Sequence, residues 1–126
     1  EAGRRAGATV VCDVPRGLTG AACAALDRAD LAVLVVPADV KACMAAKPVV
    51  EQASERGVRL KAVVRGPAPG GLTTAQVVEA IDVPLLTAMR PEPRLARALD
   101  NGHFPETTRG PLAKAARQVL EALNAH

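Results

Sequence analysis

The chain has 126 residues, which is enough for one folded domain with its own core. Hydrophobic residues make up 49% of it, which excludes an intrinsically disordered chain. Aromatic residues make up only 1%, which excludes a surface that stacks nucleic-acid bases. The formal net charge of +3 is too small to indicate an acidic partner by itself. Because the first residue is not methionine, we expect the chain to be part of a longer protein.

The cysteines and histidines do not indicate a metal site. Cys12, Cys23 and Cys43 lie in apolar surroundings, and their spacing matches no zinc motif. We expect all three to be buried, reduced thiols in a cytoplasmic protein. His103 and His126 have no second ligand at a usable spacing. No apolar run approaches the roughly 20 residues that cross a membrane.

The N-terminal half alternates between strand and helix patterns. A β-branched apolar run predicts a strand at residues 8–14. An alanine-rich helix is expected at 18–29, and a fully apolar strand at 31–36. Asp39 then has the position of an N-cap for a helix at 40–56.

The middle of the chain continues the alternation. Pro48 should kink the preceding helix or divide it in two, and Gly57 marks its end. A third strand is predicted at 58–64, followed by a loop of glycines and prolines at 66–71. Thr73 is expected to cap the next helix.

The C-terminal third completes the pattern with a helix at 74–81, a strand at 84–88, and helices at 92–101 and 111–125. This order predicts an α/β fold, with a parallel sheet of about four strands and helices on both faces. One edge of so small a sheet needs cover, either from strands outside these residues or from a partner subunit.

The most informative motif is TVVCDVPRG at residues 9–17. Its β-branched run ends in Asp13, and a Pro–Arg–Gly turn follows. Open α/β sheets bind ligands at the carboxyl ends of their strands, so Asp13 is a candidate site residue. The alternative is an aspartate that only caps the turn. These residues contain no glycine loop followed by Gly-Lys-Ser/Thr, so the loop at 66–71 is expected to be a surface loop.

Four segments together carry a family resemblance. They read VVCDVPRG (10–17), RADLAVLVVPADV (28–40), LKAVVRG (60–66) and VPLLTAMRPEPRLARALDNGHFP (83–105). In this order the chain resembles the C-terminal portion of MinD/ParA-type P-loop ATPases, and within them the CpaE-like, septum-site-determining branch. The resemblance implies that residues 1–126 form the C-terminal portion of a MinD/ParA-like domain. The implied fold is part of a P-loop NTPase, Rossmann-like three-layer sandwich.

The resemblance also implies functions for residues at the strand ends. Asp13 matches the aspartate that acts through Mg²⁺ and water near the γ-phosphate, which makes it the catalytic and metal candidate. Arg65 stands where the family has an asparagine that reads adenine, and arginine offers no acceptor to the adenine amino group. The candidate nucleotide-contacting residues are Asp13, Pro15, Arg16, Gly17, Arg65, Arg90, Pro91 and Glu92.

Each of these candidates has a structural alternative. Arg16 could be a solvated surface arginine, and the turn at Arg90 could have no ligand. A basic face near the C-terminus is a third feature, and its alternative is an ordinary solvated helix face. It comprises Arg90, Arg94, Arg97, Arg109, Lys114 and Arg117.

By this resemblance the protein is a regulator in septum-site determination or cell division control, and this stretch is not catalytic on its own. The implied state is a homodimer that contacts proteins of the division or pilus and secretion machinery. It would act in the cytoplasm or peripherally at the inner membrane or septum. The alternative is an ATPase that positions pilus or secretion machinery, with its phosphate loop upstream. ATP and Mg²⁺ would then bind the parent protein, and not this stretch alone. Binding of DNA or a membrane surface through the basic face is a further hypothesis.

Overall fold

The computed structural model describes residues 2–17, 19–104 and 109–125. Its elements are α1 (Ala2–Arg5), α2 (Gly20–Arg28), β1 (Ala32–Pro37), α3 (Val40–Glu55), β2 (Leu60–Arg65), α4 (Thr74–Ile81), β3 (Leu85–Met89), α5 (Leu95–Asp100) and α6 (Pro111–Asn124). Leu18, which the predicted second element included, lies outside the described residues. This alternation confirms the predicted α/β class.

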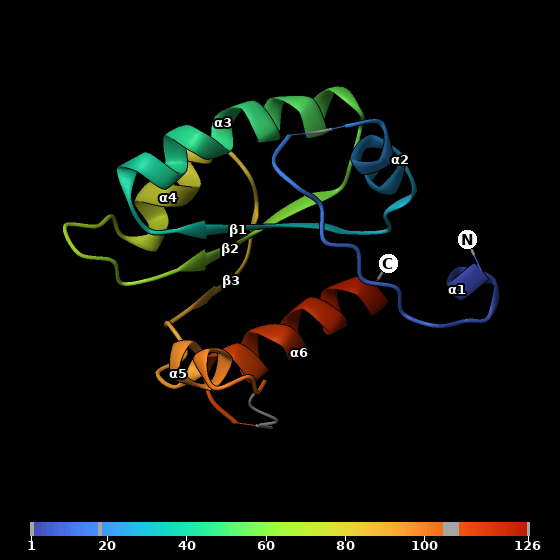
Figure 1. Ribbon diagram of the computed structural model, residues 1–126. Coiled ribbons are helices and arrows are strands. Elements are labelled where there is room, and N and C mark those ends of the chain that lie inside the picture. Colours follow the sequence, from blue (N-terminus) through green and yellow to red (C-terminus); the bar gives the residue numbers. More distant parts are fainter. Residues whose placement is uncertain (1, 18, 105–108, 126) are drawn as a thin grey trace.

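The sheet has the order β1-β2-β3, and both pairings are parallel. Ala32 of β1 pairs with Leu60 of β2 at one end, and Pro37 pairs with Arg65 at the other. Helices α3 and α4 cover one face of the sheet, and α6 packs against β3 on the other (Figure 1). The predicted parallel sheet with helices on both faces is therefore confirmed.

Small side chains make up the core between α3 and the sheet. Cys43 and Ala46 of α3 are buried against Ala62 and Val64 of β2, and Ala62 is fully inaccessible to solvent. Because these side chains are short, the helix can lie close to the strands. Burial raises the pKa of the Cys43 thiol, and the nearby carboxylate of Asp39 raises it further, so this thiol is neutral at physiological pH.

Local signals set the helix ends as predicted. The Asp39 carboxylate accepts a hydrogen bond of 2.7 Å from the amide of Ala42 and caps α3. Thr73 and Gln76 form a reciprocal capping box at the start of α4, with hydrogen bonds of 3.2 and 2.9 Å. Gly57 follows the end of α3 with a φ of +68°, a conformation that favours glycine.

An ion pair connects the two helices that lie over the N-terminal half. Arg56, at the end of α3, donates two hydrogen bonds of 2.8 Å to the two carboxylate oxygens of Asp27 in α2. These bonds raise the pKa of the Arg56 guanidinium above its ordinary value. Both side chains are partly exposed, so the pair contributes little to the stability of the fold.

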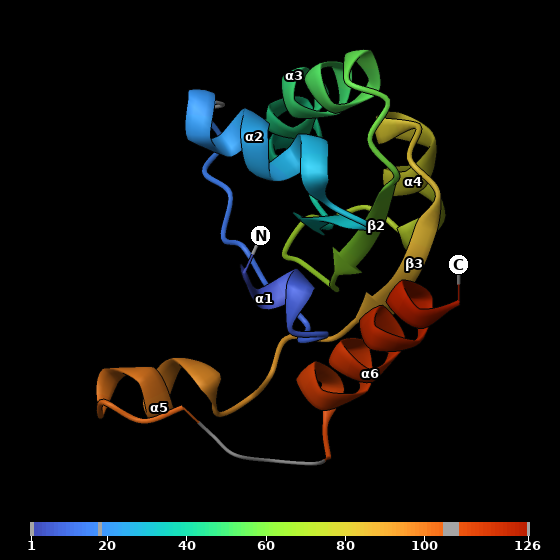
Figure 2. The same cartoon turned by 90° about the vertical axis from the view of Figure 1, so that its right-hand side faces the viewer.

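The predicted strand at residues 8–14 is wrong for this structure. These residues have no regular secondary structure and pair with no strand, so the described sheet has three strands. Figure 2 shows this segment passing beside the sheet between α1 and α2. β-Branched residues favour a strand only where a partner edge offers hydrogen bonds, which this segment lacks. Cys12 is therefore exposed rather than buried, and Cys23 is only partly buried, whereas Cys43 is buried as expected.

Pro48 does not divide α3, which runs as one helix from Val40 to Glu55. Proline has no amide hydrogen, so the carbonyl of Met44 loses its helical partner. Met44 is 65% exposed, which leaves this turn of the helix open to water. The predicted helix at 92–101 is shorter, beginning at Leu95 after two prolines.

The close packing of α3 on the sheet predicts that two alanine substitutions differ strongly in their effect on stability. Ala46→Leu should destabilise the full-length protein by about 1–3 kcal/mol, because the larger side chain must push α3 off the sheet. The control Ala75→Leu, on the exposed side of α4, should change stability by less than about 0.5 kcal/mol. Urea unfolding of both variants measures the difference. Equal effects would contradict close packing at Ala46.

Candidate functional site

The carboxyl ends of the three strands meet at one edge of the sheet and are joined by backbone hydrogen bonds. The amide of Ala38, just after β1, donates to the carbonyl of Arg65 at 2.9 Å. The amide of Gly66, just after β2, donates to the carbonyl of Met89 at 2.9 Å. Arg65 and Arg90 therefore lie at adjacent strand ends, as the sequence predicts. Both are exposed, and they give this edge positive charge.

The glycine-rich loop at 66–71 packs against the end of β1. A Cβ atom at Gly66 would lie 2.9 Å from the Cβ of Ala38, and one at Gly71 would collide with the Ala38 carbonyl oxygen. The same oxygen accepts a hydrogen bond of 2.8 Å from the amide of Leu72. These glycines are therefore required by close packing.

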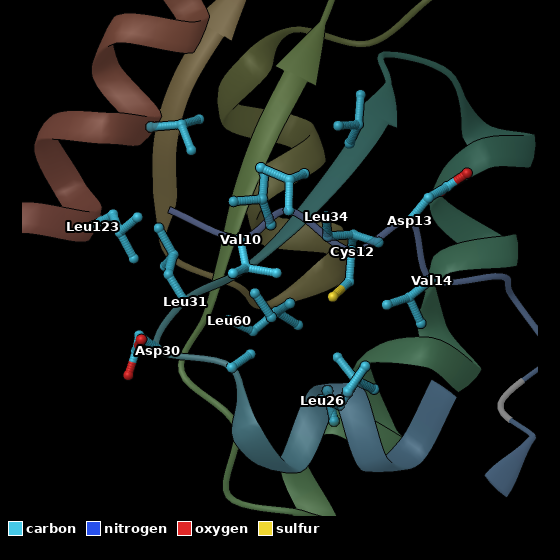
Figure 3. Close-up of a pocket in the computed structure, with 18 of the residues that line it drawn as sticks. Val10, Cys12, Asp13, Val14, Leu26, Asp30, Leu31, Leu34, Leu60 and Leu123 are labelled. Atoms are coloured by element: carbon cyan, nitrogen blue, oxygen red, sulfur yellow. The ribbon is translucent and has the colours of Figure 1, made fainter. Parts of the chain in front are cut away.

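The residues of the Asp-Val-Pro-Arg motif lie on a different part of the molecule. Asp13, Pro15 and Arg16 are exposed and line a cavity of about 1040 Å³ beside β1, and Gly17 follows them in a bend. Figure 3 shows the Asp13 carboxylate directed away from the apolar side chains of this cavity, such as Leu60. A carboxylate in this position is solvated.

Asp13 is not brought together with the arginines of the sheet edge. Within the part of the chain that the structure describes, no hydrogen bond or ion pair joins it to Arg65 or Arg90. Arg90 lines a second cavity, of about 560 Å³, which shares no lining residue with the first. The polar residues of this second cavity are Arg90, Arg109, Lys114 and Arg117. The predicted site residues therefore form two groups, one in the segment beside β1 and one at the carboxyl ends of the strands.

Glu92 has a structural contact that the sequence did not indicate. Its carboxylate accepts a hydrogen bond of 3.1 Å from the amide of Leu112, in the first turn of α6. A carboxylate here satisfies an amide that has no partner within the helix and complements the positive end of the helix dipole. Pro91, its neighbour, is exposed. Whether the turn also contacts a nucleotide stays a prediction.

A second contact fixes α6 on the sheet. Thr87 of β3 is the one buried polar residue among those described, and its hydroxyl donates to the side-chain oxygen of Gln118 in α6. The sequence did not indicate this contact, because a threonine in a strand and a glutamine in an amphipathic helix are both common and carry no specific signal. The bond holds the middle of α6 against β3.

Asp13 is a single exposed carboxylate, and no group of three or more metal-ligating side chains occurs in the described ranges. Arg65 presents no acceptor to an adenine amino group. None of the described helices is both long and apolar enough to cross a membrane.

Comparison with known sequences gives two relatives. No family model matches the chain. It is 53% identical over 123 residues to the uncharacterized protein Rv3660c of Mycobacterium tuberculosis (strain ATCC 25618 / H37Rv). It is equally similar to the uncharacterized protein MT3760 of strain CDC 1551 / Oshkosh. Each match covers 98% of this chain but only 35% of the relative, so the chain spans about a third of their length.

Comparison with solved structures identifies the fold. The chain matches the MinD cell division protein of Aquifex aeolicus with a TM-score of 0.70 and 19% identity, over 87% of this chain and 50% of that one. The fold is MinD-like. The cell division ATPase MinD of Pyrococcus furiosus gives a TM-score of 0.68 over the same shares, again at 19% identity. The MinC:MinD complex of Aquifex aeolicus gives 0.62. The MinD-like fold confirms the resemblance at the level of architecture, and assignment to the CpaE-like branch stays a prediction.

The contact between Glu92 and α6 gives a prediction about stability. Glu92→Ala should destabilise the protein by about 1 kcal/mol, because the first turn of α6 loses its cap. Glu92→Gln retains an acceptor oxygen, so it should destabilise the protein less than Glu92→Ala does. Glu79→Ala, at an exposed position of α4, is the control and should have little effect. Urea unfolding measures all three, and similar losses at both alanine variants would contradict a capping function.

Proposed function

We propose that the protein is a regulator of the MinD/ParA type, acting in septum-site determination or cell division control through contacts with other proteins. The observation that carries this proposal is the MinD-like arrangement of the three parallel strands and their helices, with a TM-score of 0.70 over 87% of the chain. Both first-matched structures are named as cell division proteins.

A regulatory rather than catalytic function is supported by the site. Asp13 lies apart from the arginines of the sheet edge, and the glycine loop packs on Ala38. By the resemblance, Arg65 stands where the family has an asparagine that reads adenine. These features leave the residues described without a phosphate-binding loop. The regulator would then act by binding partners rather than by hydrolysing ATP.

The same comparison supports a protein partner. One matched structure is a MinC:MinD complex, in which a protein with this fold is bound to a second division protein. We propose that this protein likewise contacts a division protein and assembles as a homodimer, as the resemblance to the MinD/ParA type implies. DNA and acidic membrane surfaces stay as predictions that rest on the basic face alone.

The alternative is an ATPase that positions pilus or secretion machinery, with its phosphate loop in another part of the full-length protein. It is favoured by the exposed positive charge of Arg65 and Arg90 at adjacent strand ends, since such an edge attracts phosphates. In that case Asp13 would hold Mg²⁺ through water, and the metal would supply charge neutralisation at the phosphates.

Calorimetric titration of the full-length protein with ATP and Mg²⁺ separates the two functions. A non-catalytic regulator should show no binding in the micromolar range. An ATPase should bind ATP at micromolar concentrations, and Asp13→Asn should weaken that binding by about tenfold or more through loss of the metal contact. Asp82→Asn, an exposed carboxylate at the end of α4, is the control and should leave the titration unchanged. Micromolar binding that responds to Asp13 would overturn the regulatory proposal.

Depletion of the protein in the source organism tests its cellular function. We expect septa at abnormal positions and cells of uneven length in time-lapse microscopy, with normal placement restored by the wild-type gene. Counting surface pili in the same cells tests the alternative. Normal septa together with lost or misplaced pili would replace the division function with the positioning of pilus machinery.

A further inference from the structure

Helix α5 stands apart from the rest of the molecule. None of its residues, Leu95–Asp100, is buried, and it has no extensive contact with another described helix or strand. Figure 2 shows α5 separated from both α6 and the sheet. A helix of six residues is not stable alone in water, so the segments on either side must hold it in place.

Hydrogen bonds on both sides hold this helix. Before it, the Glu92 carboxylate accepts the hydrogen bond of 3.1 Å from the Leu112 amide of α6. After it, the amides of Gly102 and His103 donate to carbonyls of α5 at 3.0 and 2.8 Å, and Gly102 has a φ of +78°. This pair of bonds is the Schellman motif, which ends a helix and sets the direction of the chain that follows. Residues 90–104 therefore have a defined conformation, and we call them the α5 arm.

Two large apolar side chains of the α5 arm lie in water. Phe104, the one aromatic residue of the chain, is 64% exposed, and Leu99 is 55% exposed. Phenylalanine is among the residues most often buried, yet neither side chain belongs to the hydrophobic core. Exposed apolar groups that lie together mark surfaces that bind other molecules. A partner that covers these two side chains would bury apolar surface that the fold leaves in water.

The same arm is rich in arginine. Arg90, Arg94 and Arg97 are exposed, and the arm contains no lysine. Within the described ranges, neither Arg94 nor Arg97 forms an ion pair or a side-chain hydrogen bond. Interfaces between proteins are enriched in aromatic residues and arginine and depleted of lysine. A guanidinium group pairs with a carboxylate through two hydrogen bonds, so this composition favours an acidic protein as the partner.

The basic cavity of about 560 Å³ lies at the base of the α5 arm. A Cβ atom at Gly110, which lines this cavity, would lie 3.1 Å from the carboxylate of Glu92 in the arm. No carboxylate occurs among the described residues that line the cavity, and its four charged lining residues are Arg90, Arg109, Lys114 and Arg117. A concave surface of this charge attracts anionic groups. Carboxylates of a segment bound along the arm would therefore be stabilised here.

We propose that the α5 arm is a docking site for an acidic segment of a partner protein. Apolar side chains of this segment would cover Leu99 and Phe104, and its carboxylates would face the arginines of the arm and of the cavity at its base. The inference rests on the proposed function, because it names the surface that the partner contacts and the chemistry of that partner.

Other occupants fit the α5 arm less well. Duplex DNA offers phosphates to the arginines but leaves Leu99 and Phe104 in water, because its backbone is charged throughout. A helix that lies on a membrane buries a continuous apolar face, and α5 has fewer than two turns. A second copy of these residues has a formal net charge of +3, so its charge does not complement the arginines.

Photo-crosslinking in the source organism tests this proposal. The full-length protein carries a benzophenone amino acid in place of Phe104 or, as the control, in place of Met44, which is 65% exposed on α3. We expect position 104 to crosslink an acidic peptide of another protein, identified by mass spectrometry, at about five times the yield of position 44 or more. A product formed only within the same protein or its second copy, a basic peptide, or no product at position 104 would overturn the proposal.

The control position also separates this inference from the function on which it rests. A division protein crosslinked from position 44 and not from position 104 would overturn the docking arm and leave the regulatory function supported. An acidic partner crosslinked from position 104, in an organism whose septa stay normal on depletion, would support the arm and contradict the division function.

Titration calorimetry of the full-length protein with a synthetic peptide of the crosslinked sequence gives a second measurement. Phe104→Ser removes the apolar anchor and Arg97→Gln removes a carboxylate partner, so each should weaken binding about tenfold or more. Met44→Ser is the matched control and should bind like the wild type. None of the three should shift the melting temperature by more than about 2 °C, because all three side chains are exposed. Unchanged affinity of Phe104→Ser, or binding to phosphatidylserine vesicles in place of the peptide, would overturn the proposal.

Discussion

The parallel pairing of β2 with both of its neighbours is the interaction on which the rest of the structure depends. Strand β2 lies in the centre of the sheet, and Ala62, Val63 and Val64 within it are buried. Because both pairings are parallel, the carboxyl ends of all three strands meet at one edge, where Arg65 and Arg90 lie. The small side chains of α3 then pack directly on this sheet. The two faces are completed by α4 and α6.

The sequence predicts those features that are local. Asp39 and Thr73 cap their helices as expected, because a cap needs only a side chain and an amide three residues away. The strand at residues 8–14 is not formed, because a strand depends on a partner that composition cannot supply. The contact of Glu92 with Leu112 could not be foreseen for a related reason, since 20 residues separate the two.

The candidate site was predicted in part. That Arg65 and Arg90 share an edge follows from parallel topology, which the alternation of elements already implies. The position of Asp13 relative to them does not follow, because the segment that carries it is not held by hydrogen bonds to the sheet.

Ala38 has a further consequence for this edge. Its amide donates a hydrogen bond to the carbonyl at the end of β2, and its carbonyl accepts one from the amide of Leu72. Its methyl group lies against Gly66. This methyl group therefore sets the spacing between the loop that follows β1 and the loop that follows β2. A bulkier side chain at this position would push the two loops apart and change the distance between groups that it does not contact. Affinity for whatever binds at this end of the sheet could then change through a residue hidden from the ligand.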